Sequence, residues 1–163
     1  MNKQKILEEI NKTEEHLSNL KKMLEECEYK RWKPKEGEKY YALNRYEEAT
    51  TDEWFDTCYN NDMFNLYNVF RTREQAEAEA EKILVRRQLE DIAKRLNKGK
   101  KIDWDDENQF KRYISYHNSW GIKTYSVCGS KTQGTVYCLD ENFLLVAIQE
   151  IGEERLKNYL RGE

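Results

Sequence analysis

The chain has 163 residues, 38% of them hydrophobic and 12% aromatic, which suits one compact domain with an appendage and not two full domains. Its 28 Lys and Arg residues nearly balance 31 Asp and Glu residues, and the net charge of -3 argues against a general binder of nucleic acids or anionic membranes. No run approaches the roughly 18–20 apolar residues of a membrane span, and the charged N-terminus is unlike a signal peptide, so we expect a cytoplasmic protein.

Residues 1–30 have the pattern of an amphipathic helical arm. Apolar or small side chains recur at alternating spacings of four and three, the repeat of a coiled coil, and predict a helix over about residues 3–27. This heptad stripe either joins two copies of the chain as a homodimer or packs on the chain's own domain. Its regular period favours self-association. The residues expected to carry the self-association are Ile6, Ile10, Leu17, Leu20 and Leu24, and Thr13 and Cys27 complete the stripe.

The segment RWKPKEGEKYY, residues 31–41, marks the boundary between this arm and a domain that we assign to residues 31–163. Pro34 disfavours helical geometry at the residue before it and Gly37 permits a turn, so the helix is expected to end upstream. The Trp32 side chain is expected to pack, partly buried, under this turn. A nucleic-acid contact is the alternative for the basic residues here, but two glutamates interrupt them.

Short aromatic and β-branched runs begin at Tyr40. The runs YYALNRY, EWFDTCYN and MFNLYNVF are separated by polar clusters and predict strands of a small antiparallel sheet. A helix of about 25 residues is predicted next, with Thr72 as its N-cap and Lys98-Gly99 at its end. Its apolar face changes phase near Arg86, so the helix is expected to bend or to contact two different surfaces. The residues of that face are Ala76, Ala80, Ile83, Val85, Leu89, Ile92 and Leu96.

The chain then repeats this plan. QFKRYISYH, GIKTYSVC and TVYCL predict three strands, and DENFLLVAIQEIGEERLKNYL predicts a helix capped by Asp140. When Thr72 is placed over Asp140, the core positions of the two helices coincide, so residues 38–99 and 103–163 are candidate repeats of a strand-strand-strand-helix unit. The expected fold is α+β: an N-terminal coiled-coil-like helix followed by an antiparallel sheet with helices packed on one face.

Few residue patterns in this chain indicate metal, cofactor or catalytic chemistry. Four cysteines and two histidines lack the paired spacing of a zinc site, and no glycine-rich phosphate loop is present, so we expect neither metal nor cofactor. The thiols are expected to be reduced.

The carboxylates of DWDDENQ could hold Mg²⁺ or act as acid and base, yet they lack the spacing of a calcium loop and suit turn caps. His117, beside Ser119, is the remaining catalytic candidate, and we expect the protein not to be an enzyme.

Charge is divided unevenly along the long predicted helix. Its acids, with the acidic run that follows the helix, are candidates for a partner-binding face that mimics nucleic-acid phosphates in the basic groove of a nuclease: Glu74, Glu77, Glu81, Asp103, Asp105, Asp106 and Glu107. Its bases are candidates for holding nucleic acid: Arg86, Arg87, Lys94, Arg95, Lys98, Lys100 and Lys101. The third interpretation is a solvated helix face whose acids and bases partly follow the helix dipole. Eleven tyrosines are a composition that favours a protein interface.

The stretches WKPKEGEKYY, NVFRTREQAEAEAEKI, IDWDDENQFKRYISY and EIGEERLKNYL together resemble a family of small uncharacterised proteins from phages and prophages of Gram-positive bacteria, over residues 31–160. The resemblance implies a phage accessory protein in the host bacterial cytoplasm and assigns no catalytic residue. Such proteins often bind and disable host machinery, as anti-CRISPR proteins do. We therefore expect an inhibitor of a host protein, with a CRISPR-type defence nuclease as the specific candidate. The alternative is a nucleic-acid-binding phage protein that uses the basic end of the long helix.

Overall fold

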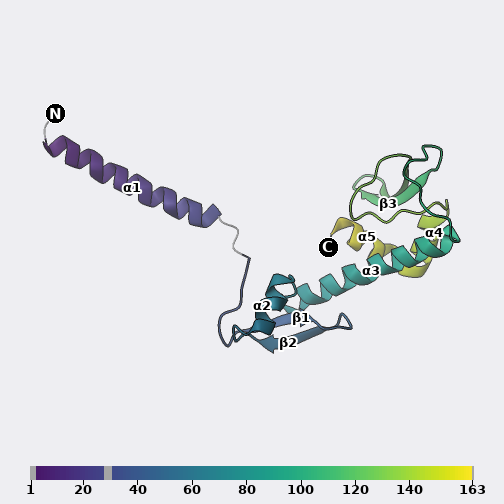
Figure 1. The fold of residues 1–163 in the computed structure, drawn as a ribbon, viewed down its shortest axis with the longest axis horizontal. Helices are drawn as coiled ribbons and strands as arrows, with labels where there is room; N and C mark the ends of the chain where they lie inside the picture. The colour runs from purple at the N-terminus through teal and green to yellow at the C-terminus, as the bar shows by residue number, and fades with distance from the viewer. Residues whose placement is uncertain (1–2, 28–30, 163) are drawn as a thin grey trace. The chain divides into compact units, whose positions relative to one another are not determined.

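The computed structural model describes residues 3–27 and 31–162. The chain divides into two compact units, Met1–Lys33 and Pro34–Glu163, and each is described by itself. The described residues form five helices and four strands, which confirms the predicted α+β class (Figure 1). In chain order these are α1 Lys3–Cys27, β1 Lys39–Leu43, β2 Ala49–Glu53, α2 Cys58–Asn65, α3 Arg73–Asn97, β3 Lys111–His117, β4 Gly121–Val127, α4 Phe143–Ile151 and α5 Glu153–Arg161.

The first unit contains α1, which has the bounds that the heptad pattern predicts. Lys, Glu, Asn and Gln fill most of the positions between the stripe residues, and most of these are good helix formers. Thr13, the polar member of the stripe, donates its hydroxyl to the carbonyl of Glu9 at 2.7 Å. Because this bond satisfies the hydroxyl within the helix, Thr13 can occupy an apolar stripe without a partner from elsewhere.

The second unit begins with an antiparallel hairpin. In it Tyr41 of β1 lies opposite Thr51 of β2, and Phe70 pairs with the free side of Tyr41 through two backbone hydrogen bonds of 2.8 and 3.0 Å. Beneath the hairpin, the Trp54 ring meets Tyr40 and Phe64 edge to face, at centroid distances of 5.9 and 6.1 Å. These large rings supply the apolar surface that a two-stranded sheet needs for stability.

Residues 53–70 differ from the prediction, which assigned two strands to EWFDTCYN and MFNLYNVF. Residues 58–65 form the helix α2, and only Phe70 joins the hairpin, as a single bridge. Thr57 starts α2 because its hydroxyl accepts a hydrogen bond from the backbone N–H of Asn60 at 3.2 Å. The aromatic residues that suggested strands fill a core from a short helix instead.

The long helix α3 connects the two ends of the second unit (Figure 1). The elements β1, β2 and α2 lie at its start, α5 lies beside its middle, and β3 and α4 lie toward its end. Thr72 caps it as predicted, accepting from the N–H of Gln75 at 3.3 Å, and Lys98 ends it with a left-handed φ of 49°. Ala76 is buried near its start, whereas Val85 and the residues after it belong to a separate buried cluster. The prediction that α3 contacts two different surfaces is confirmed.

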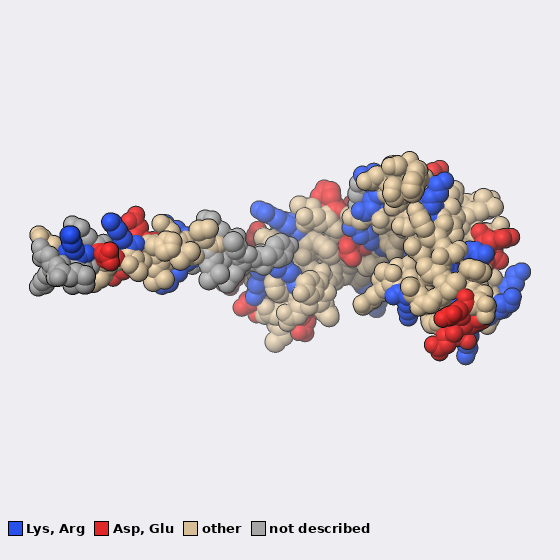
Figure 2. All heavy atoms as spheres, turned by 90° about the horizontal axis from the view of Figure 1, so that it is seen from above, with Lys and Arg blue, Asp and Glu red and all other residues tan. Residues whose placement is uncertain are grey.

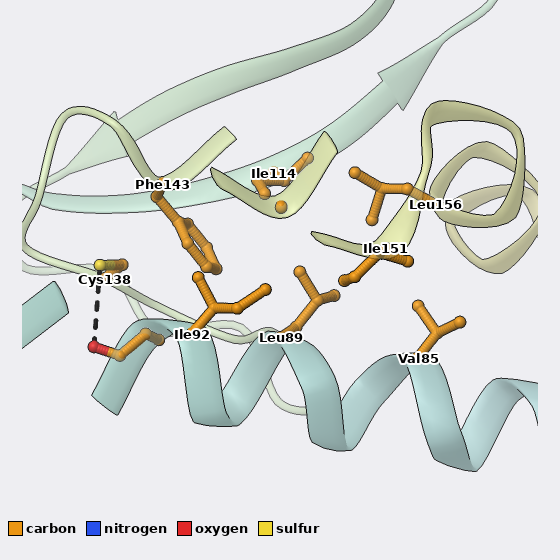
Figure 3. Close-up of a cluster of buried hydrophobic side chains, with 10 residues drawn as sticks. Val85, Leu89, Ile92, Ile114, Cys138, Phe143, Ile151 and Leu156 are labelled. Carbon is orange, nitrogen blue, oxygen red and sulfur yellow. Dashed lines mark hydrogen bonds between the residues drawn. The ribbon is translucent and has the colours of Figure 1, made fainter. Parts of the chain in front are cut away.

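That buried cluster is the main core of the second unit. Figure 3 shows side chains of α3 pointing toward β3, α4 and α5, with the Cys138 thiol donating to the carbonyl of Ala93 at 3.9 Å. Cys138 also pairs with Arg112 of β3 through two backbone hydrogen bonds of 2.7 and 2.8 Å. The cluster comprises Val85, Leu89, Ile92, Ala93, Ile114, Cys138, Phe143, Ala147, Ile151 and Leu156.

The last predicted helix is divided in two. Gly152 separates α4 from α5 with φ 94° and ψ 140°, a conformation outside the helical region that glycine adopts readily. Asp140 is not the N-cap as predicted, because α4 starts two residues later with Asn142 as its cap. The Asp140 carboxylate instead accepts from the N–H of Asn142 at 2.8 Å, which shapes the turn before the helix.

The two ends of the second unit share one plan. Each has an antiparallel hairpin whose first strand is bridged by one residue, Phe70 or Cys138, and a helix follows that residue closely. The bridging residues lie two positions before Thr72 and Asp140, the positions that the sequence alignment superposes. The strands form two separate pairs, and the third strand expected in each repeat is reduced to a bridge.

Candidate functional site

The acids of the predicted partner-binding face on α3 have partners within the chain. Glu77 pairs with Arg73 at 2.7 Å, and Glu81 pairs with Arg155 of α5 at 2.6 Å. Hydrogen bonds from its own backbone N–H and from the Thr72 hydroxyl lower the pKa of Glu74. Two of these three acids are therefore locally neutralised, which weakens a phosphate-like field.

The acidic run between α3 and β3 shapes its own loop. The Asp103 carboxylate accepts from the N–H of Asp105 at 3.0 Å, and that of Asp106 accepts from the N–H of Asn108 at 2.9 Å. These are the turn-capping bonds expected of Asp in loops. Within residues 3–27 and 31–162, no three carboxylate, Cys or His side chains are grouped so as to hold a metal ion. This run, with Glu107, follows the last turn of α3, whereas Glu74 lies in its first turn, so the structure does not join the two acidic sets.

The basic residues predicted to hold nucleic acid, on α3 and just after it, separate into two groups. The first group is three arginines in ion pairs: Arg86 with Glu90 at 3.0 Å, Arg95 with Asp91 at 2.8 Å and with Glu150, and Arg87 with Glu47. Figure 2 shows basic and acidic side chains interspersed over the visible face of the second unit. The second group is Lys94, Lys100 and Lys101, which line a groove, while Lys98 is the C-cap of α3.

This groove, of about 750 Å³, lies where the end of α3 meets the two loops that flank the β3–β4 hairpin. The groove is also lined by Lys131, Trp104 and Tyr137, which no sequence pattern assigned to a site. Trp104 meets Tyr137 edge to face, with ring centroids 4.9 Å apart. Nothing in the local sequence indicates that the loop carrying Lys131 approaches α3.

A second surface that sequence analysis missed surrounds α2. Four large side chains on α2 or next to its ends are exposed, and we call them the α2 surface: Phe55 at 54%, Tyr59 at 60%, Leu66 at 74% and Tyr67 at 75%. Tyr67 has a φ of 61°, which is rare for a bulky residue. The local aromatic content was visible in the sequence, but the predicted strands placed these side chains on a sheet.

The side chain of Asn60 fixes α2 in place beneath this surface. It donates to the Tyr40 hydroxyl at 2.9 Å, and it accepts from the backbone N–H of Phe55 at 3.1 Å and from the Thr57 hydroxyl at 2.9 Å. Asn60 is buried, and its bond to the Tyr40 hydroxyl is buried with it, whereas the other two bonds are partly buried. The α2 surface is therefore held on an anchored helix.

The predicted self-association residues lie on α1. Ile10, Leu17 and Leu20 are each about half exposed, as side chains on an isolated helix are. The side chains of Ile6 and Leu24 lie outside the described residues. The structure of the single chain thus presents the central part of the heptad stripe to solvent.

His117, the catalytic candidate named from the sequence, makes contacts within its own turn. His117 accepts from the backbone N–H of Ser119 at 3.2 Å and stacks on Trp120 with ring centroids 4.2 Å apart. Cys58, Cys128 and Cys138 are free thiols, and burial raises the pKa of Cys138. The side chain of Cys27 lies outside the described residues.

No described helix has the length and apolar character needed to cross a membrane. Comparisons of the chain with protein-family models, with curated proteins and with solved structures find no match.

Proposed function

We propose that this chain is a non-enzymatic binding protein that engages a protein partner through the α2 surface. The observation that carries this proposal is the exposure of Phe55, Tyr59, Leu66 and Tyr67 around one short helix. Exposed apolar groups gathered in one place mark interaction sites, and tyrosine is enriched among the residues that dominate binding energy.

The attachment of α2 supports the same proposal. Asn60 holds the helix through three side-chain hydrogen bonds, so a partner would meet a surface that is already ordered. Binding to a preformed surface avoids much of the entropy cost of ordering a loop. The backbone of Tyr67, held at a positive φ, is the kind of strained position found at ligand-binding segments.

The resemblance to phage proteins supplies the partner class in this proposal: a host protein, with a CRISPR-type defence nuclease as the specific candidate and inhibition as the outcome. The partner would contribute an apolar surface against which the amphipathic rings of Tyr59 and Tyr67 can pack. It differs from the acidic face that the sequence suggested, since Glu77 and Glu81 are occupied by arginines of the same chain.

Tyr67→Gly provides a sharp test, because it removes the ring and also relieves the positive φ. We expect the tagged wild-type protein to retain one specific protein from a nuclease-treated lysate of a Gram-positive host, and Tyr67→Gly to lose it while keeping its thermal stability. Tyr46→Ala, which removes a tyrosine that is 66% exposed and lies between β1 and β2, is the matched control and should retain the partner.

A cleavage assay tests the specific candidate. We expect the wild-type protein to inhibit DNA cleavage by a purified, guide-loaded CRISPR nuclease, and we expect Tyr67→Gly to inhibit it far less than Tyr46→Ala does. Equal retention of the same partner by all three proteins would contradict the α2 surface. Failure to inhibit, together with capture of an unrelated host protein, would contradict the nuclease as partner.

A further inference from the structure

We propose that the groove at the end of α3 binds the phosphate and base of a nucleotide, presented by single-stranded nucleic acid or by a free nucleotide. We call it the Lys-Trp groove and define it by Lys94, Lys100, Lys101, Lys131, Trp104 and Tyr137. This site is separate from the α2 surface and does not depend on the function proposed above.

The charge of the Lys-Trp groove favours a phosphate. Its four lysines are exposed, and none of them forms an ion pair with any residue in the described part of the chain. Glu90 also lines the groove, but its carboxylate lies 3.0 Å from the guanidinium of Arg86. The residues that line the groove, four lysines and one glutamate, therefore carry a net positive charge, which attracts anionic ligands.

The aromatic side chains of the groove favour a base. Trp104 is partly exposed and lies against the buried Tyr137, whose hydroxyl accepts from the N–H of Thr132 at 2.9 Å. The Lys131 ammonium lies 5.8 Å from the centre of the Trp104 ring. A base stacked on Trp104 would take the position of this cation and leave Lys131 close to the phosphate of the same nucleotide.

Trp104 is supported from within the protein. The buried Lys111 donates to the carbonyls of Asp106 and Cys128, both at 2.7 Å, and its ammonium lies 5.6 Å from the Trp104 ring centre. These bonds tie together the loop before β3 and the loop after β4, which carry Trp104 and Lys131 respectively. The stacking platform is therefore built before a ligand arrives.

The size of the groove agrees with a nucleotide. Its volume of about 750 Å³ falls within the range of about 300–1,000 Å³ that is usual for small-molecule sites. Unpaired lysines beside an accessible aromatic ring are also how proteins hold single strands without reading their sequence. A duplex keeps its bases stacked on one another, so Trp104 gives it no comparable contact.

The experiment measures binding of a labelled oligothymidine of about ten nucleotides by fluorescence anisotropy at about 50 mM salt. We expect Lys100→Glu combined with Lys101→Glu to weaken binding by at least about tenfold. The matched control, Lys12→Glu combined with Lys22→Glu, changes the total charge equally at exposed positions of α1 and should bind as the wild type does. We also expect binding to quench tryptophan fluorescence, and Trp104→Phe to abolish that quenching.

Competition distinguishes the two sources of the ligand. Displacement of the labelled strand by AMP but not by inorganic phosphate would identify a free-nucleotide site, and displacement only by unlabelled single strands would identify a strand site; both support the proposal. Three results would overturn the proposal. The first is that the folded wild-type protein does not bind the labelled strand, and the second is that the Lys12→Glu, Lys22→Glu control binds as weakly as the Lys100→Glu, Lys101→Glu variant. The third is that duplex binds more tightly than the single strand while Trp104→Phe still shows the same quenching.

Discussion

Asn60 shows how one polar side chain can decide the conformation of a segment. Its buried amide forms hydrogen bonds with groups on β1, on the turn before α2 and on the N-cap Thr57. Without these bonds the aromatic residues of 53–70 would be compatible with the strands that composition predicts. The Tyr40 hydroxyl, which lies beneath the hairpin, depends mainly on Asn60, because its own contact with Asp52 is long at 3.4 Å.

We predict that Asn60→Ala lowers the free energy of unfolding by about 1–3 kcal/mol, because it leaves buried polar groups without partners. Urea unfolding followed by tryptophan fluorescence measures this change, since Trp54 lies against Tyr40. Asn65→Ala, at the exposed end of the same helix, should change the stability much less. If the two variants were equally stable, the anchoring role of Asn60 would be wrong.

At the scale of elements, local signals were predictable and distant contacts were not. The bounds of α3 follow from its apolar period, from Thr72 and from the left-handed end at Lys98, which are all features of neighbouring residues. The helix α2 is fixed by a bond between residues 20 positions apart, Asn60 and Tyr40, which no local pattern contains. The Lys-Trp groove likewise joins Trp104 to Lys131, which come from different loops.

The break between α4 and α5 had a visible sequence signal, Gly152, that the predicted continuous helix passed over. We predict that Gly152→Ala costs about 1–3 kcal/mol of stability, because φ 94° strains any residue with a β-carbon. Nothing lies within 4 Å of the position that an added β-carbon would occupy, so the cost is one of backbone conformation alone. Gly129→Ala, at an equally open site without a positive φ, is the control for thermal unfolding, and equal melting temperatures would refute the explanation.

For α1 we predict self-association in solution. Leu17→Glu places a charge in the heptad stripe and should convert the dimer to a monomer, measured by sedimentation equilibrium. Lys12→Glu combined with Lys22→Glu changes exposed positions outside the stripe and should leave the dimer intact. A wild-type protein that sediments as a monomer at all accessible concentrations would show that the stripe does not mediate a homodimer.

At the scale of the whole second unit, α3 joins two ends that each contain a side chain removed from water that ionises at alkaline pH. Burial raises the pKa of Tyr40 at one end and the pKa values of Cys138 and Tyr159 at the other. Each of these groups keeps its proton in the folded state at pH values where the unfolded chain has lost it. Their contribution to stability is therefore complete below their ordinary pKa values and is lost as the pH rises through the raised ones.

We consequently predict that the free energy of unfolding falls between about pH 8 and about pH 11, a range that includes the ordinary tyrosine pKa of about 10. Urea unfolding at a series of pH values measures the slope. Tyr159→Phe removes the hydroxyl that ionises while it keeps the partly buried ring, so its slope should be shallower than that of the wild type. Tyr46→Phe changes an exposed tyrosine and should leave the slope unchanged. If Tyr159→Phe followed the wild-type slope, the burial of the phenol would not be the source of the alkaline instability, and the loss would have to originate at Tyr40 or Cys138.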